Sequence, residues 1–253
     1  MASAPPRLPP LPGPRCTAVS ARAVNHGGRT APELSGPTPR VVVVTSGKGG
    51  VGKTTTTANL AASLARLSFP TVAVDADAGL RNLDLLLGLE NRVHLTAADN
   101  TASSLINTGV DAGFVTAIAP AEEAVLVTTP DITALRDADR VAGLLECDGI
   151  KDIKIIVNRV RPDLVKGEDM MSALDVQEML GLPLLGVVPE DAEVIRSTNR
   201  GVPLVLNDPP TPAGLALEQA TWRLVERDAM TAVMVEEQER PKKKGGLFSF
   251  FSR

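Results

Sequence analysis

Strand-like and helix-like patterns alternate along the chain from Arg40 to Val235. Short runs rich in β-branched residues predict buried strands, and they lie at Val41–Thr45, Thr71–Val74, Ala124–Thr128, Lys154–Val157 and Leu184–Val188. Segments with apolar residues every three or four positions predict helices, at Thr55–Leu67, Ala112–Ile118, Ile132–Glu146, Met170–Leu180 and Ala213–Val235. This order predicts an α/β fold, a doubly wound and mostly parallel sheet with helices on both faces.

The two ends of the chain lack this pattern. Residues 1–39 hold nine of the 20 prolines, four arginines and a single acid, without apolar periodicity. This composition predicts disorder, and a segment rich in Arg and Ser but poor in acids is typical of an organelle transit peptide. An ordinary disordered tail is the alternative. We therefore expect three parts: the segment 1–39, a domain over 40–235 with an irregular junction at 91–110, and a tail over 236–253.

The tail combines basic and aromatic residues. Three of the six aromatic residues of the protein fall within the last six positions. On a helix, one face would carry Leu247, Phe248, Phe250 and Phe251, directly after the basic run Lys242–Lys244. An apolar face beside basic residues predicts reversible attachment to an anionic membrane surface. A frayed tail without that role is the alternative.

Charge is distributed unevenly. The formal net charge is −4, while segments 1–39 and 236–253 carry +3 and +2, so residues 40–235 carry −9. An acidic domain argues against a broad nucleic-acid-binding surface, and we expect no nucleic-acid partner. No apolar run reaches the length of a membrane-spanning helix.

The first predicted strand runs into a glycine-rich loop with the spacing G-x4-G-K-T, followed by the first predicted helix. In this order, backbone N–H groups and a helix N-terminus converge on an anion. The Lys53 ammonium would reach the outer phosphates and the Thr54 hydroxyl would ligate Mg²⁺. The candidate nucleotide-binding residues here are Gly47, Lys48, Gly49, Gly50, Val51, Gly52, Lys53, Thr54 and Thr55.

A second lysine, Lys48, follows the first glycine of this loop. The octapeptide from Gly47 to Thr54 resembles the deviant Walker A box of P-loop NTPases of the MinD/ParA family. The resemblance implies ATP and Mg²⁺ as cofactors, and an ATP-dependent homodimer in which Lys48 reaches the nucleotide of the partner subunit.

Other segments resemble the MinD branch of that family. The sequence from Asp75 to Asp84 is similar to its switch I, which implies that Asp77 positions water and Mg²⁺ with support from Asp75. The resemblance thus makes Lys48 and Asp77 the catalytic candidates, and Thr54 and Asp77 the metal candidates. It also assigns Asn158 to the adenine edge, with Pro189 and Asp191 bracketing the base.

The resemblance is strongest to plastid members of that branch. It implies a protein that hydrolyses ATP, binds membrane through its tail, responds to a MinE-like activator and helps to place the plastid division site. It further implies residence in the chloroplast stroma, peripheral on the inner envelope membrane.

The chain departs from the family in one place. Where the family has a strand ending in a Walker B aspartate, residues 91–109 are shorter and no aspartate ends an apolar run, and Asp111 is poorly placed as a substitute. We expect a central strand to be lost, which would forfeit roughly 7–15 kcal/mol of burial. A hydrolysis-deficient or non-folding isoform is therefore the main alternative, and a DNA-partitioning ATPase of the ParA type is a less favoured one.

Overall fold

The computed structural model describes residues 17–19, 40–76, 82–89, 103–108 and 118–239. They form a seven-stranded sheet in the order β1-β3-β4-β2-β5-β6-β7, and every adjacent pair is parallel. The strands are β1 (Thr17–Val19), β2 (Val41–Thr45), β3 (Thr71–Asp75), β4 (Ser103–Asn107), β5 (Glu123–Thr128), β6 (Asp152–Val160) and β7 (Leu184–Pro189). The predicted doubly wound α/β fold is confirmed.

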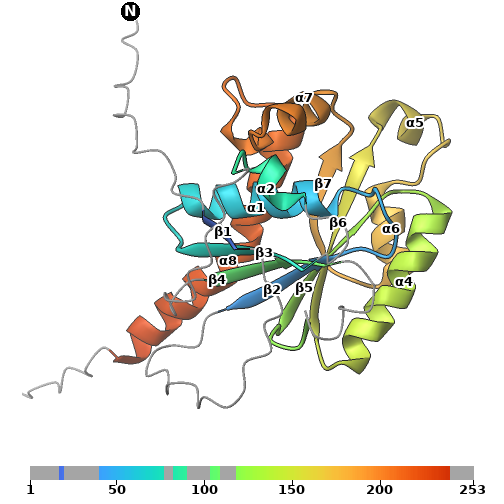
Figure 1. The fold of residues 1–253 in the computed structure, drawn as a ribbon. Coiled ribbons are helices and arrows are strands. Elements are labelled where there is room, and N and C mark those ends of the chain that lie inside the picture. Colours follow the sequence, from blue (N-terminus) through green and yellow to red (C-terminus); the bar gives the residue numbers. More distant parts are fainter. Residues whose placement is uncertain (1–16, 20–39, 77–81, 90–102, 109–117, 240–253) are drawn as a thin grey trace, which may run out of the picture.

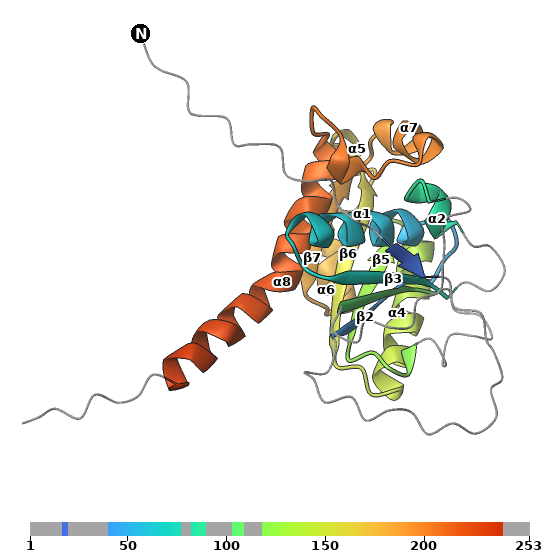
Figure 2. The same ribbon diagram turned by 60° about the vertical axis from the view of Figure 1, so that its left-hand side comes forward.

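Helices cover both faces of this sheet, as Figures 1 and 2 show. On one side α1 packs beside α8, and on the other α4 packs beside α6. The helical elements are α1 (Lys53–Arg66), α2 (Leu83–Leu86), α4 (Ile132–Cys147), α5 (Pro162–Lys166), α6 (Ala173–Leu180), α7 (Glu193–Arg200), the 3-10 turn η1 (Leu204–Leu206) and α8 (Pro212–Glu239). Four of the five predicted helices match α1, α4, α6 and α8, and most of the fifth lies outside the described residues.

The sheet separates two hydrophobic cores because successive side chains of a strand point to opposite faces. Val44 and Leu105 belong to the core beneath α1 and α8, whereas Val43 and Ile106 belong to the core beneath α4. All four are at most 8% exposed. Burying a side chain of this size contributes roughly 1.5–3 kcal/mol, so the central strands hold the two helical layers together.

The expected loss of a central strand is wrong. Residues Ser103–Asn107 form β4 between β3 and β2, the central position beside the strand that precedes the glycine-rich loop. Leu105 pairs with Val42 on one side and with Ala73 on the other. The short junction segment therefore supplies the central strand of the sheet, and this strand ends at Asn107.

Part of the segment predicted to be disordered also joins the sheet. Thr17–Val19 pairs in parallel with β3 as the edge strand β1. The other residues of segment 1–39 lie outside the described residues, as do the tail residues Leu247, Phe248, Phe250 and Phe251.

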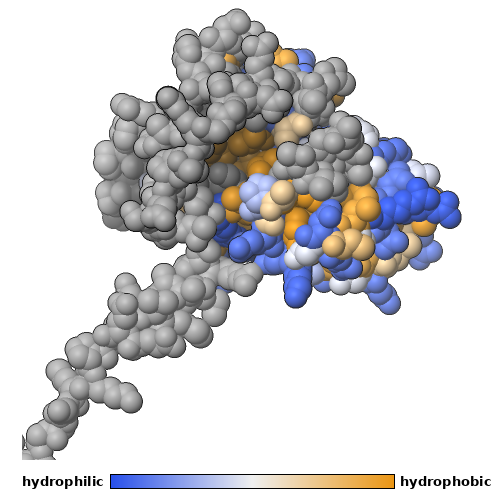
Figure 3. All heavy atoms as spheres, turned by 60° about the horizontal axis from the view of Figure 1, so that its bottom comes forward, coloured by the Kyte–Doolittle hydropathy of each residue, from blue (hydrophilic) through white to orange (hydrophobic). Residues whose placement is uncertain are grey.

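The C-terminal helix α8 has 28 residues, so it is about 42 Å long. Its C-terminal part extends beyond the body of the domain (Figure 2). In the described part of the chain, no helix is both long and apolar enough to cross a bilayer. Seen from the lower edge, hydrophobic residues lie in the centre of the face and hydrophilic ones gather at its right-hand side (Figure 3).

Candidate functional site

The glycine-rich loop connects β2 to α1 and has the backbone geometry of an anion site. Gly50 and Gly52 adopt positive φ angles of 79° and 102°, which favour glycine. The helix begins directly after Gly52, whose carbonyl accepts a hydrogen bond of 2.9 Å from the Thr56 amide. The first turn of α1 contains no acidic residue. Its N-terminal amides and positive dipole end are therefore available to an anion.

Neighbouring elements fix the loop from two sides. A Cβ atom on Gly47 would lie 2.3 Å from the carbonyl of Asp137, so the loop backbone rests directly on the backbone of α4. On the other side, the Nδ2 atom of Asn158, near the end of β6, donates a hydrogen bond of 2.8 Å to the Val51 carbonyl. The loop is thus held by α4 and β6 before any ligand binds.

Lys48 lies at the mouth of the loop and contacts the N-terminus of α4. Its Nζ atom donates to the Thr133 hydroxyl at 3.0 Å and lies 3.8 Å from Asp131 Oδ1. Asp131 is the N-cap of α4 and accepts a hydrogen bond from the Ala134 amide. Partial burial raises the pKa of Asp131, but hydrogen bonds from Thr129, Thr133 and Ala134, together with the Lys48 charge, lower it to about 2. The Lys48 side chain is half exposed, so a partner can reach it.

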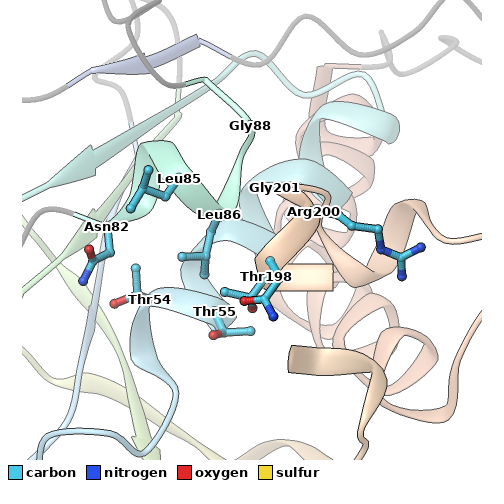
Figure 4. Close-up of a pocket in the computed structure, with 10 residues that line it drawn as sticks. Thr54, Thr55, Asn82, Leu85, Leu86, Gly88, Thr198, Arg200 and Gly201 are labelled. Carbon is cyan, nitrogen blue, oxygen red and sulfur yellow. The ribbon is translucent and has the colours of Figure 1, made fainter. Parts of the chain in front are cut away.

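The start of α1 opens onto a cavity of about 630 Å³. Figure 4 shows Thr54 and Thr55 below the α2 side chains Leu85 and Leu86, with Thr198 of α7 beside Thr55. Asn82 and Leu86 line the cavity from the α2 side and Thr198 from α7. Arg200 extends away from the other labelled side chains in that view and pairs with Glu193. Lys53 and Thr54 are both only partly buried, so the two residues predicted to bind phosphate and metal are accessible to a ligand.

A pair of buried polar side chains lies at the ends of β3 and β4. Asp75 and Asn107 are opposite each other in the sheet, and Asn107 Nδ2 donates to Asp75 Oδ1 at 2.9 Å. Asp75 Oδ2 accepts hydrogen bonds from the amides of Asn82 and Leu83, where α2 begins. Asp75 therefore anchors α2. Asn107 Oδ1 is buried and has no hydrogen-bond partner among the described residues, and a buried acceptor without a donor costs about 1–3 kcal/mol.

The remaining candidates occupy the ends of β6 and β7. Asn158 contacts the loop, and its Oδ1 accepts from the next backbone amide, that of Arg159. Pro189 ends β7, while Asp191 Oδ1 accepts a hydrogen bond of 2.8 Å from the Glu193 amide. These contacts place all three residues near the carboxyl ends of β6 and β7. None of the contacts shows that they bind a nucleotide base. Asp77 lies outside the described residues.

Sequence reasoning missed the polar residues Asp131, Thr133 and Asn107. An aspartate directly before a predicted helix is an N-cap signal, which would have singled out Asp131. Nothing local marked Asn107, because Ser103–Asn107 contains only two apolar residues. Its role depends on Asp75, which lies 32 positions earlier in the chain.

The residues present fit a nucleotide with Mg²⁺. Among the described residues, no cluster of three or more His, Cys, Asp or Glu side chains could hold a metal by itself. Mg²⁺ in phosphate sites does not need such a cluster, because it keeps several waters and takes oxygen ligands from the phosphates. Among the described residues, the Thr54 hydroxyl is accessible to such a hydrated ion, and Asn107 Oδ1 is a buried oxygen that lacks a hydrogen-bond donor.

Comparison with known proteins agrees with this geometry. Residues 42–204 match the CobQ/CobB/MinD/ParA nucleotide binding domain. The chain belongs to the MinD/ParA family. It is 60% identical over 277 positions to the chloroplastic septum site-determining protein minD homolog of Arabidopsis thaliana, with 87% of this chain and 84% of that protein covered. Family membership establishes the glycine-rich loop as part of a nucleotide-binding domain.

Solved structures support the same assignment. The MinC:MinD cell division protein complex of Aquifex aeolicus gives a TM-score of 0.69 at 35% identity, covering 74% of this chain and 96% of that one. MinD of Pyrococcus horikoshii complexed with Mg-ADP gives a TM-score of 0.65 at 26% identity, covering 76% and 98%. The fold of this family member is therefore that of solved MinD proteins.

The alignment with the Arabidopsis protein also indicates that this chain is shorter than that protein within the aligned region. It extends over 277 positions although 87% of this chain is only about 220 residues, so it opens gaps within this chain. Internal shortening agrees with the brief junction at residues 91–110.

Proposed function

We propose that this protein is a MinD-type ATPase that binds ATP with Mg²⁺ at the glycine-rich loop, dimerises on ATP and attaches to membrane through its tail. The observation that carries the proposal is the loop itself. Its backbone is fixed against α4 through Gly47, it opens onto the N-terminus of α1, and it presents Lys48 at its mouth. In this proposal, Lys53 and the loop amides bind phosphate, and Mg²⁺ supplies charge neutralisation for phosphoryl transfer.

The position of Lys48 supports a role across a dimer interface. Its ammonium lies on Thr133 and Asp131, outside the loop, rather than within its own phosphate site. Both contacts are exposed, and exposed ion pairs contribute only about 0–1 kcal/mol. A nucleotide phosphate bound to the partner subunit would readily replace these two contacts of Lys48. Asp77 remains the candidate for orienting the attacking water.

The proposed cellular role is placement of the plastid division site. It is supported by the similarity to the chloroplastic MinD homolog and to the septum site-determining proteins. The arginine-rich segment 1–39 supports import into the chloroplast stroma, where the protein would lie peripherally on the inner envelope membrane. The basic, Phe-rich tail after α8 would make the membrane contact. A MinE-like activator and a MinC-like partner are the expected protein partners, the latter because a MinD relative forms such a complex.

The dimer is tested by light scattering after gel filtration of the full chain with ATP or with ADP. We expect the mass to double with ATP and Mg²⁺ but not with ADP, and Lys48→Ala to remain monomeric while still binding nucleotide. Doubling of the mass in Lys48→Ala would contradict the proposed role of this lysine. Liposome sedimentation with and without residues 245–253 tests the tail, because loss of those residues should abolish ATP-dependent binding to anionic vesicles.

A second function is favoured by one observation. The strand beside the loop ends in the neutral Asn107 rather than in a carboxylate. This chain would then bind ATP and dimerise but turn over slowly, as a binding partner for an active subunit. Single-turnover hydrolysis separates the two functions, because a folded, nucleotide-bound chain without phosphate release would support the second.

A further inference from the structure

A second cavity lies at the C-terminal end of α1, where that helix packs beside α8. It has a volume of about 650 Å³ and is lined by the last residues of α1, by η1 with the residues that follow it, and by the first turns of α8. Since α1 has 14 residues, its two ends are about 21 Å apart, so this cavity is separate from the one beside Thr54. Its volume lies within the range of small-molecule sites, about 300–1,000 Å³.

Part of the cavity wall is apolar. Leu204 and Val205 of η1 line it and are 1% and 6% exposed, so they form a packed floor. Leu215 of α8 also lines it but is 44% exposed, and its side chain therefore presents apolar surface to solvent. Covering such surface with the hydrocarbon part of a ligand is favourable, because it removes apolar area from water.

Charged side chains give the cavity a net negative charge. Its lining holds two acids, Asp208 and Glu218, and one base, Arg66. Arg66 Nη1 donates to the Val205 carbonyl and lies 3.7 Å from Glu218 Oε1. A backbone carbonyl thus fixes Arg66, and its single charge balances one of the two carboxylates. The lining therefore keeps a formal charge of −1, which favours a monocation.

The two helix ends at the cavity also favour a cation over an anion. At the start of α8, the amides of Gly214 and Leu215 donate to the hydroxyl and the carbonyl of Thr211. The Ala213 amide donates to Asp191 Oδ2 at 3.4 Å. These three donors are already used within the protein, so they are not available to an anion. The cavity faces the C-terminal end of α1, which carries the negative end of that helix dipole.

We infer that this cavity binds an amphipathic organic cation, a protonated amine on an apolar chain or ring. The ammonium group lies at the carboxylates of Asp208 and Glu218, and the apolar body covers Leu215 and the residues of η1. An ammonium group has three donors and no acceptor, which suits a pair of carboxylates. The inference goes beyond the proposed nucleotide function and does not depend on it, because the cavity shares no residue with the glycine-rich loop.

Saturation-transfer difference NMR of the full chain tests the inference with three probes that share a phenyl ring: protonated phenethylamine, neutral phenethyl alcohol and anionic hydrocinnamate. We expect the amine to bind most tightly and hydrocinnamate most weakly. Glu218→Gln should weaken amine binding about three- to fivefold, the loss typical of one exposed ion pair, and leave the affinity for the alcohol unchanged. The matched control is Glu226→Gln, which removes the same charge from an exposed position of α8 outside the cavity. It should leave all three affinities unchanged.

A second pair of variants tests the apolar contact. Leu215→Ala should weaken binding of the amine and of the alcohol by the same factor, about threefold, because both probes place the same ring against this side chain. Leu144→Ala truncates a leucine of α4 with a similar exposure, 46%, and should change neither affinity. All four replaced side chains lie outside the two hydrophobic cores, so we expect the variants to fold.

Several outcomes would overturn the inference. Absence of amine binding, or equal affinity for the three probes, would show that the cavity does not select a cation. An unchanged amine affinity in Glu218→Gln would place the amine elsewhere, and an equal loss in Glu226→Gln would assign the binding to the overall charge of the domain. Failure of the protein to bind ATP would overturn the proposed function and leave this inference standing.

Discussion

Leu105 tests whether the short junction segment rebuilds the centre of the sheet. Replacing Leu105 by alanine removes three carbon atoms from a side chain that is 1% exposed and packed in the core beneath α1. At about 0.8 kcal/mol per methylene group, the lost transfer free energy is about 2.4 kcal/mol. The residual cavity adds to this, since both neighbouring strands are fixed by parallel pairing, and Leu→Ala changes in cores cost about 2.7–5 kcal/mol. We expect a loss of about 3–4 kcal/mol in the free energy of unfolding.

Urea denaturation followed by circular dichroism measures this loss. The midpoint should fall while the slope with urea stays the same, because the change affects stability and not the surface exposed on unfolding. Leu144→Ala is the control, since Leu144 is 46% exposed on α4 and its truncation should cost less than about 1 kcal/mol. A Leu105→Ala protein as stable as the control would mean that Ser103–Asn107 does not occupy the sheet.

Three further predictions concern the loop and its supports. Gly47→Ala should abolish nucleotide binding in calorimetry, because its Cβ would lie 2.3 Å from the Asp137 carbonyl, whereas a Cβ on Gly143 of α4 would meet no atom within 4 Å, so Gly143→Ala should bind normally; equal binding by both variants would refute the close packing. Asn158→Ala should lower the free energy of unfolding, measured by urea denaturation, by about 1 kcal/mol, since it removes the hydrogen bond to the Val51 carbonyl, and it should weaken ADP binding. An unchanged free energy of unfolding and unchanged ADP affinity would show that this hydrogen bond does not hold the loop. Hydrogen bonds and the Lys48 charge lower the pKa of Asp131 from its ordinary value of 3.8 to about 2 in the folded protein, so its ionised form stabilises the fold above about pH 4 and that contribution disappears as the pH falls toward 2. Asp131→Asn should therefore flatten the acid dependence of the unfolding free energy between pH 5 and pH 2.5, and an identical slope in both proteins would contradict the assigned pKa.

The main elements were predictable because their patterns are local. Val41–Thr45 is a run of β-branched residues with the bounds that the structure gives, and the glycine spacing after it predicts the loop and the start of α1. Ser103–Asn107 was not predicted as a strand, because serine and asparagine are weak strand formers. Its two apolar residues are instead held in place by β2 and β3 on either side.

The candidate site was predictable only as far as motifs extend. Thr54 and Lys53 follow from the loop spacing, and the structure leaves both accessible. The contact of Lys48 with Thr133 joins residues 85 positions apart, and the contact of Asn107 with Asp75 joins two strands. Such pairs depend on how the chain crosses between layers, which residue spacing does not specify.

The direct contact between the Gly47 backbone and α4 limits how this protein can vary. Since no side chain separates the two main chains, there is no adjustable layer that could absorb a shift of the helix by even a few tenths of an ångström. Insertions or deletions in the short turn between β5 and α4 would move the part of α4 on which Gly47 rests. They would also move Asp131 and Thr133, which contact Lys48. Divergence should therefore accumulate at the outer end of α4, around Glu146, while the length of that turn stays constant.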